Sequence, residues 1–309
     1  MDAIAKAALL GQAAQYDICA ACGHDAGRVR DDVGRWIYPA ALPDGRRVQL
    51  FKVLLSNACE RDCGYCANRA GRDVRRVAFS PDELAAIFAQ LVERRMASGL
   101  FLSSAICRSP NQAMERMLAA VEIVRRRYHF RGYVHLKILP GVERAAVERA
   151  VQLAQRVSVN LEAPNPARLA RLSEAKHFES DLWQRLRWAH EAILARGARL
   201  AGQTTQFVVG ASGESDQELL ATTARLYREL HLERTYFSAF QPVAGTPLDG
   251  LPATPAIREH RLYQSDFLLR RYGFGFGELV FDRSGNLPLT ADPKLAWAER
   301  HPEWFPLEV

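Results

Sequence analysis

Short apolar stretches of β-strand type alternate with longer segments of helical periodicity along most of this 309-residue chain. Such alternation is typical of repeated strand–helix units that form a parallel sheet. We expect strands at residues 49–55, 99–103, 132–138, 156–161, 203–209 and 234–241. Helices are expected between them at residues 82–97, 112–128, 142–154, 182–196 and 215–230. The sequence therefore predicts an α/β fold, in which functional groups lie at the carboxyl ends of the strands.

Three cysteines, Cys59, Cys63 and Cys66, follow the first expected strand directly in CxxxCxxC spacing. A short loop with this spacing can curl around one iron–sulfur cubane, so that each thiolate meets a different iron. The fourth iron then has no protein ligand and can bind another molecule. The alternative is a structural zinc site completed by Cys107 or His24, but zinc sites come as paired CxxC knuckles or with closely spaced histidines. The spacing therefore favours an iron–sulfur centre that performs chemistry.

Arginine dominates the basic residues of the chain. Lysine and arginine total 41, of which five are lysine, and the net charge is +6. Because the planar guanidinium suits phosphates and stacks on bases, nucleic acid is an expected partner; the alternative is arginine spread over solvated helix faces. Five arginines near the cysteines predict a basic rim for a nucleic acid, a small acidic substrate or an acidic reductant: Arg61, Arg69, Arg72, Arg75 and Arg76.

Cellular location follows from the apolar pattern and the cysteines. No apolar stretch approaches the roughly 18 residues of a membrane span, and the N-terminal apolar stretch is too short for an export signal. Six cysteines with three in one metal loop fit a reducing compartment better than a disulfide framework. We expect a cytoplasmic protein without a membrane association.

The cysteine loop resembles the signature loop of the radical S-adenosylmethionine (SAM) enzymes, in which SAM chelates the open iron through its amino and carboxylate groups. The resemblance implies a 4Fe–4S cluster held by Cys59, Cys63 and Cys66, and reductive cleavage of SAM to a 5'-deoxyadenosyl radical. Tyr65, just before the last cysteine, is then expected beside the adenine. The implied fold is a partial (β/α)6 TIM-like barrel at residues 48–250, with an N-terminal extension (1–47) that carries a CxxC and a C-terminal helical extension (251–309).

Polar residues at later strand ends are the expected contacts to SAM. The resemblance assigns this role to Ser103 and Ser104, which stand where the family often has glycines, although small residues there also suit close packing. Alternation points Asn160 and Glu162 to one face of their strand, where they serve SAM or an internal polar network. The remaining expected SAM contacts are Gln206 and Gly210, and the turn at Gly210 also reads as an ordinary helix cap.

Four further residues are expected to face the substrate: His135, Lys137, Tyr236 and Gln241. Period-two alternation puts His135 and Lys137 on one side of a strand, where either could touch phosphate or donate a proton. The alternative is a buried histidine whose hydrogen bonds are satisfied, beside a lysine with its head in water. Cys107 is expected to be a packed residue, or else a hydrogen donor that quenches a product radical.

A second cysteine pair, Cys19 and Cys22 with His24 close behind, forms an isolated CxxC ahead of the barrel. It either binds a second cluster or zinc with ligands from elsewhere, or is a reactive or structural pair. The tryptophans are expected in the core rather than as platforms for bases.

Segments along nearly the whole chain make the resemblance more specific, to one group within the radical SAM family. They are LLSNACERDCGYCANR, GLFLSSAICRSP, YVHLKILPG, SVNLEAP, GQTTQFVVGA, REHRLYQSDFLLRRYGF and DPKLAWAERHPEWFPLEV. They look like those of radical SAM proteins assigned to DNA modification or repair and associated with uracil-DNA-glycosylase-like proteins. Members of that group often continue into a helix-hairpin-helix-like DNA-binding tail, so we expect the basic surface to be the phosphate contact of this chain, which stops at Val309.

The implied partners are DNA, with RNA as the alternative, a uracil-DNA-glycosylase-like protein, and an electron donor such as flavodoxin or ferredoxin. Two other functions stay open. One is a radical SAM enzyme that acts on tRNA or a small molecule, and the other is a non-catalytic module whose metal is structural.

Overall fold

The computed structural model describes residues 2–14, 36–41, 45, 47–197 and 202–304. Within them, seven strands form one sheet whose spatial order is the order of the sequence. The strands are β1 (Ile37–Ala41), β2 (Arg47–Leu54), β3 (Gly99–Ser103), β4 (Tyr133–Lys137), β5 (Arg156–Ser158), β6 (Gly202–Val209) and β7 (Arg234–Ala239). Strand β1 is antiparallel to β2, and every later pair is parallel. The architecture is a curled α/β half-barrel.

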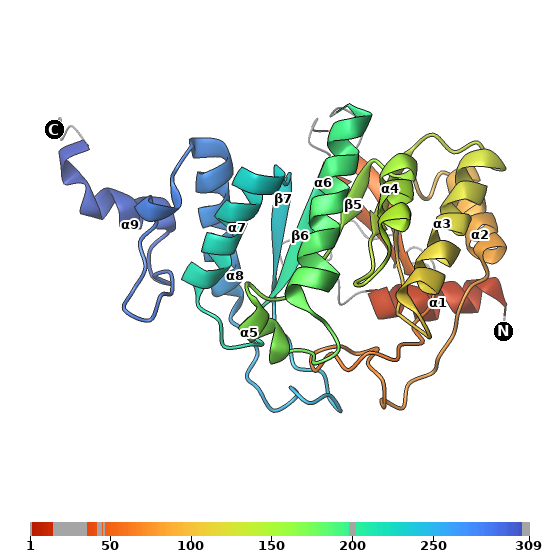
Figure 1. Ribbon diagram of the computed structural model, residues 1–309, viewed down its shortest axis with the longest axis horizontal. Coiled ribbons are helices and arrows are strands. Elements are labelled where there is room, and N and C mark those ends of the chain that lie inside the picture. Colours follow the sequence, from red (N-terminus) through yellow and green to blue (C-terminus); the bar gives the residue numbers. More distant parts are fainter. Residues whose placement is uncertain (1, 15–35, 42–44, 46, 198–201, 305–309) are drawn as a thin grey trace.

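Helices follow the strands in turn and cover one face of the sheet (Figure 1). They are α2 (Pro81–Glu93), α3 (Pro110–Arg126), α4 (Arg144–Leu153), α5 (Pro166–Ala170), α6 (Gln184–Arg196), α7 (Asp216–Leu230) and α8 (Ala256–Phe267). Helix α1 (Ala3–Ala14) packs on β2, and α9 (Pro293–Arg300) lies at the far end beside α8. None of the helices in the described residues combines the length and apolar character needed to span a membrane.

The six expected strands are all present, and residues 99–103 match β3 at both ends. The strand expected at 156–161 is shorter than expected, because β5 ends at Ser158. Strand β1 was missed, because residues 37–41 were placed in the N-terminal extension. The helix expected at 182–196 begins earlier, with a π-helical segment at Phe178–Trp183 that runs into α6.

Local capping explains where two of the helices begin. Ser80 caps α2, its hydroxyl accepting from the Glu83 amide while the Glu83 carboxylate accepts from the Ser80 amide. Ser215 and Glu218 form the same capping box at α7. Reciprocal capping satisfies backbone donors that have no partner inside the helix, and each cap stabilises its helix by about 1 kcal/mol.

The two faces of the sheet differ in polarity. Residues directed toward the helices are fully buried and apolar, for example Val53, Leu102 and Phe207. Their neighbours in the alternation, such as Lys52, Ser103 and Gln206, lie on the concave face. Burial of one face against helices holds the half-barrel together, so that the concave face is available for polar side chains.

Candidate functional site

The cysteine loop begins where β2 ends, and side chains that bond to its backbone define its shape. The Asn57 amide donates to the Arg75 carbonyl (2.9 Å), and its Oδ1 accepts from the Val77 amide (2.7 Å). The guanidinium of Arg76 donates to four carbonyls of the loop, those of Asn57 (2.7 Å), Asn68 (2.8 Å), Arg69 (2.7 Å) and Arg72 (3.2 Å). Because a guanidinium offers five donors in a rigid fork, one side chain holds four points of the loop.

Most of the arginines in this loop support its structure. Arg72 donates to the Ala244 carbonyl at 2.8 Å and so connects the loop to the segment after β7. The side chains that bond to backbone carbonyls here include Arg69, Arg72 and Arg76. The predicted rim of five arginines is therefore corrected, since three of them direct their donors inward. Arg61 lines the cavity described below, and Arg75 is exposed.

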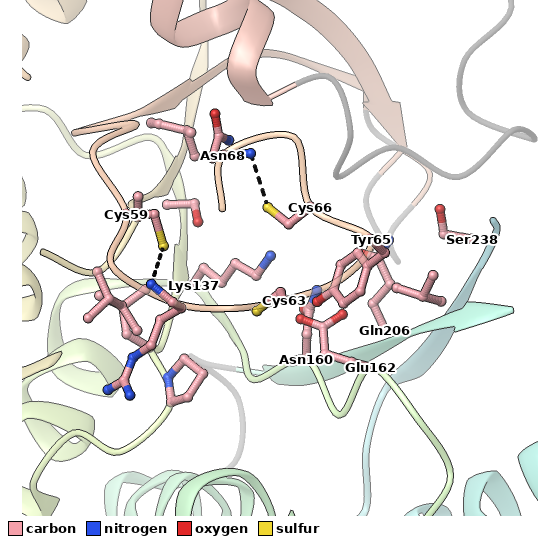
Figure 2. Close-up of a pocket in the computed structure, with 18 of the residues that line it drawn as sticks. Cys59, Cys63, Tyr65, Cys66, Asn68, Lys137, Asn160, Glu162, Gln206 and Ser238 are labelled. Carbon is pink, nitrogen blue, oxygen red and sulfur yellow. Dashed lines mark hydrogen bonds between the residues drawn. The ribbon is translucent and has the colours of Figure 1, made fainter. Parts of the chain in front are cut away.

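The three cysteine thiols converge on the same side of the loop (Figure 2). Cys63 is buried, and Cys59 and Cys66 are half-buried. Backbone amides approach two of the sulfurs, Arg61 N at 3.5 Å from Cys59 Sγ and Asn68 N at 3.4 Å from Cys66 Sγ. Burial, reinforced by the nearby Cys63, raises the pKa of Cys66 to about 12. A metal centre would offset this cost, because it binds the thiolate form and supplies positive charge.

The donor set fits a 4Fe–4S cluster. Thiolates are the ligands of such clusters, and amide hydrogen bonds to the sulfurs are part of their usual surroundings. Among the described residues, no three of His, Cys, Asp and Glu lie close enough together to hold a single metal ion. A cubane, in which each cysteine binds a different iron, does not require the three thiolates to meet at one ion.

The loop closes one side of a cavity of about 390 Å³ at the carboxyl ends of the strands. The predicted site residues that line it are Cys59, Cys63, Cys66, Tyr65, Ser103, Ser104, Lys137, Asn160, Glu162, Gln206 and Gln241. The cavity also has lining residues that sequence reasoning did not select, among them Arg61, Asn68, Lys176 and Ser238. Six different loops and strand ends thus bring the expected groups to one place, as the rule for parallel strands predicts.

Lys176 is the principal residue that sequence reasoning missed. Its Nζ lies 3.5 Å from Glu162 Oε1, 3.4 Å from Tyr65 Oη and 5.8 Å from the centre of the Tyr65 ring. Burial lowers the pKa of Lys176. The attraction of Cys63 and Glu162 is the larger effect, and it holds the pKa of Lys176 above its ordinary value. Burial also raises the pKa of Tyr65, reinforced by Glu162. A buried cation, a carboxylate and a neutral phenol therefore adjoin the cysteines.

The backbone at Glu162 is unusual. Its φ is +64°, the left-handed region that non-glycine residues seldom occupy. Two hydrogen bonds to β6 hold it there: Glu162 N donates to Gln206 O (3.0 Å), and Val208 N donates to Glu162 O (2.8 Å). Such strain persists only where surrounding structure enforces it, and here it belongs to the residue that contacts Lys176.

Two residues expected to face the substrate do not line the cavity. His135 is buried below it, with Nε2 at 2.9 Å from Ser158 Oγ and its ring packed against Phe101. Burial, and then the nearby Arg156 and Lys52, lower the pKa of His135 well below its usual value. The prediction that His135 donates a proton to the substrate is therefore corrected. Its position fits the alternative, a buried histidine whose hydrogen bonds are satisfied within the barrel. Tyr236 lies under the guanidinium of Arg234, 5.0 Å from ring centre to Cζ.

Gly210 also lies outside the cavity lining. Its φ is +92°, and the Thr254 side chain packs so closely that a Cβ would sit 2.0 Å from Thr254 Oγ1. The Glu214 carboxylate closes the turn by accepting from the amides of Gly210 and Ser212. The glycine therefore serves the turn, and the predicted contact with SAM is not supported by its position. Ser104 does line the cavity, with its hydroxyl donating to the Ala105 carbonyl (2.9 Å).

Cys107, the one further cysteine in the described part of the chain, does not join the three of the loop. Cys107 donates its thiol to Glu60 Oε1 at 3.2 Å, and this hydrogen bond raises the pKa of Cys107. Cys107 is half-buried and is not among the cavity-lining residues. Cys19, Cys22 and His24 lie outside the described residues.

A family model named radical SAM superfamily matches residues 53–226, more than half of the chain. The chain belongs to the radical SAM superfamily, and it is accordingly an enzyme that uses a 4Fe–4S cluster and SAM. A search of curated proteins finds no match.

Solved structures share the fold at low sequence identity. The FeFe-hydrogenase maturase HydG from Carboxydothermus hydrogenoformans superposes with a TM-score of 0.57 and 15% identity over 73% of this chain and 52% of its own. Methylornithine synthase (PylB) gives 0.57 and 15% over 73% of this chain and 63% of its own. This chain thus spans about half to two thirds of the length of these structures, and the likeness concerns the fold.

Proposed function

We propose that this radical SAM enzyme abstracts a hydrogen atom from a nucleotide unit of a nucleic acid, with DNA as the favoured substrate, in modification or repair. Cys59, Cys63 and Cys66 would hold the 4Fe–4S cluster, which would supply the electron for cleavage of SAM into methionine and the 5'-deoxyadenosyl radical that removes the hydrogen atom. One observation carries the proposal: the three cysteines and the polar strand ends of the concave face line one cavity. A cofactor on the loop and a substrate on the strands would meet inside it.

The size of the cavity limits how a nucleic acid could react there. At about 390 Å³ it lies near the lower end of small-molecule sites, so a duplex cannot enter. Enzymes that act on a base within a duplex extrude the nucleotide into a pocket, and a single strand avoids most of that energetic cost. We infer that single-stranded or locally opened nucleic acid reacts faster than intact duplex.

The residues of the chain have distinct parts in this scheme. Lys176, fixed by Glu162, places a positive charge beside the cysteines where acidic groups of a bound ligand would be oriented. The amide side chains of Asn160 and Gln206 supply donors and acceptors inside the cavity, as does that of Gln241. The loop and the sheet enclose the reacting groups between them, which keeps water away from a radical.

Charge is the reason to favour nucleic acid. Of 41 basic residues, five are lysine and the remaining 36 are arginine, the residue best suited to phosphate and base contacts. A second candidate, a tRNA or small-molecule substrate, is favoured by the inward bonding of Arg69, Arg72 and Arg76, which leaves fewer cations near the site.

An acidic one-electron carrier of the flavodoxin or ferredoxin type is the proposed reductant, and a uracil-DNA-glycosylase-like protein a proposed partner. A reducing, cytoplasmic location would keep the cluster-binding thiols available.

Anaerobic reconstitution with iron and sulfide, followed by dithionite and SAM, tests the proposal through the yield of 5'-deoxyadenosine. We expect SAM cleavage that Cys66→Ala abolishes and that single-stranded DNA stimulates more than duplex DNA. Stimulation by tRNA alone would select the second candidate. A loaded enzyme that no nucleic acid stimulates would contradict a nucleic-acid substrate.

A further inference from the structure

The segment that carries Lys176 is attached to the cysteine loop by a carboxylate. This segment, residues 172–176, is a loop between α5 and the π-helical segment at Phe178–Trp183. Asp62, which directly precedes Cys63, accepts three hydrogen bonds from it. The donors are Ser173 Oγ (2.5 Å), Glu174 N (2.8 Å) and Ala175 N (3.2 Å). A single side chain of the cysteine loop therefore binds the three residues before Lys176.

The neighbours of Asp62 add two further hydrogen bonds to this attachment. The Gly64 amide donates to the Leu172 carbonyl (2.7 Å), and the Arg61 guanidinium donates to the Ala175 carbonyl (3.4 Å). The cysteine loop and the segment thus form one hydrogen-bonded unit, so the position of the loop determines where the segment lies.

The carboxylate of Asp62 serves the segment rather than the loop. Its three hydrogen bonds all cross to the segment. The loop has supports of its own, because the side chains of Asn57 and Arg76 bond to its backbone on both sides of the cysteines. Removal of the Asp62 carboxylate should therefore leave the cysteines in place and release the residues before Lys176.

Lys176 is the residue of this segment that reaches the cavity. It follows Ala175 directly, and its Nζ lies 3.5 Å from Glu162 Oε1 and 3.4 Å from Tyr65 Oη. A lysine side chain loses much conformational entropy when it is fixed, so its order depends on a backbone that is already held. A group that orients a ligand must also stay within about 0.5 Å of its working position, which requires a supporting residue behind it.

We propose that Asp62 is a positioning residue, which holds segment 172–176 on the cysteine loop and thereby fixes the Lys176 ammonium for contact with SAM. The inference rests on the part given to Lys176 under the proposed function, in which it orients acidic groups of a bound ligand. It does not depend on the substrate, because SAM is the ligand concerned. The Glu162 carboxylate compensates the charge of Lys176, so the ammonium acts through the direction of its hydrogen bonds, and Asp62 controls that direction.

Equilibrium binding of SAM to the cluster-loaded enzyme, without a reductant and therefore without turnover, tests the inference. Asp62→Asn keeps the size of the side chain, removes its charge and replaces one acceptor by a donor. We expect it to weaken SAM binding by about tenfold, because a charged hydrogen bond to the ligand is misdirected, and Lys176→Met should do the same. In the Lys176→Met background, Asp62→Asn should cost no more than about a further twofold, since both residues act through the same group.

Iron content and two further variants separate positioning from damage to the loop. Asp62→Asn should load as much iron per chain as the natural protein. Ser173→Ala removes one donor and leaves the two backbone donors, so it should weaken SAM binding less than Asp62→Asn does. Asp73→Asn is the matched control, because it makes the same chemical change at an exposed residue of the cysteine loop. It should leave the affinity for SAM unchanged.

Three results would overturn the inference: unchanged SAM affinity in Asp62→Asn, an undiminished loss of affinity in the Lys176→Met background, or loss of iron in step with loss of SAM binding. Unchanged SAM affinity in Lys176→Met would overturn it together with the part given to Lys176. A loaded enzyme that shows the expected SAM affinities but that no nucleic acid stimulates would contradict the proposed substrate alone.

Discussion

The ammonium group of Lys176 lies 3.5 Å from the Glu162 carboxylate, in a pair whose side chains are 8% and 10% exposed. Glu162 belongs to the segment after β5, and Lys176 to the loop that follows α5. The pair fixes this loop over the strand ends and carries a cation to the cysteines. Because the Lys176–Glu162 pair is buried, the stability of the fold and the binding of the cofactor should both depend on the two residues together.

Lys176→Met should destabilise the metal-free protein by about 3 kcal/mol, because it leaves the Glu162 carboxylate buried without its partner. The double variant Lys176→Met with Glu162→Gln should regain part of this loss. Urea unfolding of the single and double variants measures the coupling between the residues. Additive effects of the two substitutions would contradict the role assigned to the pair.

Arg76→Gln should reduce the affinity of the loop for iron by about tenfold or more, as is usual when groups that orient metal ligands are removed. The four carbonyls that Arg76 holds lie on both sides of Cys59, Cys63 and Cys66. The neighbouring Arg75→Gln removes the same charge from an exposed side chain and is the control. Iron per chain after reconstitution is the measurement, and equal loss in both variants would refute the structural role of Arg76.

The Arg168–Glu218 pair should make stability depend on acid pH. The Arg168 hydrogen bond lowers the pKa of Glu218 to about 2, from an ordinary value of 4.5. The folded state therefore binds this proton less readily than the unfolded state, so the stabilisation is full above about pH 4.5 and is lost as the pH falls toward 2.

Unfolding of Arg168→Gln across this range checks the effect. The difference in unfolding free energy between the natural protein and the variant should be largest above pH 4.5 and shrink toward pH 2. Arg171→Gln is the comparison, because Arg171 donates to the Ser212 carbonyl rather than to a carboxylate. A difference for Arg168→Gln that does not vary with pH would show that Glu218 is not the titrating partner.

Gly210→Ala should cost more stability than the same change at another glycine of positive φ. At Gly210 the new Cβ would meet Thr254 Oγ1 at 2.0 Å, whereas at Gly273, with φ of +74°, nothing lies within 4 Å. Gly273→Ala should therefore lower the free energy of unfolding by about 1–2 kcal/mol, which is the cost of a left-handed backbone for a residue with a side chain. Gly210→Ala should lower it by more, because the added Cβ also collides with Thr254. Thermal unfolding of the two variants compares them, and equal losses would contradict the close packing against Thr254.

Much of the fold and the metal loop could be predicted from local pattern. The six parallel strands follow from apolar runs between helical segments, and the cysteine triad follows from spacing alone, because both signals lie within a few neighbouring residues. Strand β1 escaped prediction because its residues, IYPAA, form a strand only by pairing with β2. A proline within so short a run also argues against a strand unless it lies at an edge, as β1 does.

The sequence by itself determined the class of the protein, since the cysteine spacing and the βα alternation are properties of short segments. Only the tertiary structure decided which polar residues share the cavity. His135 and Lys137 are two residues apart on β4 and face the same way. His135 is nevertheless buried outside the cavity lining, whereas Lys137 lines the cavity. Lys176 had no local signal, because its contact with Glu162 and Tyr65 is made by a loop from elsewhere in the chain. The curl of the sheet decides which residues along a strand reach the cavity and which loops contact each other. No short segment of sequence encodes this curl.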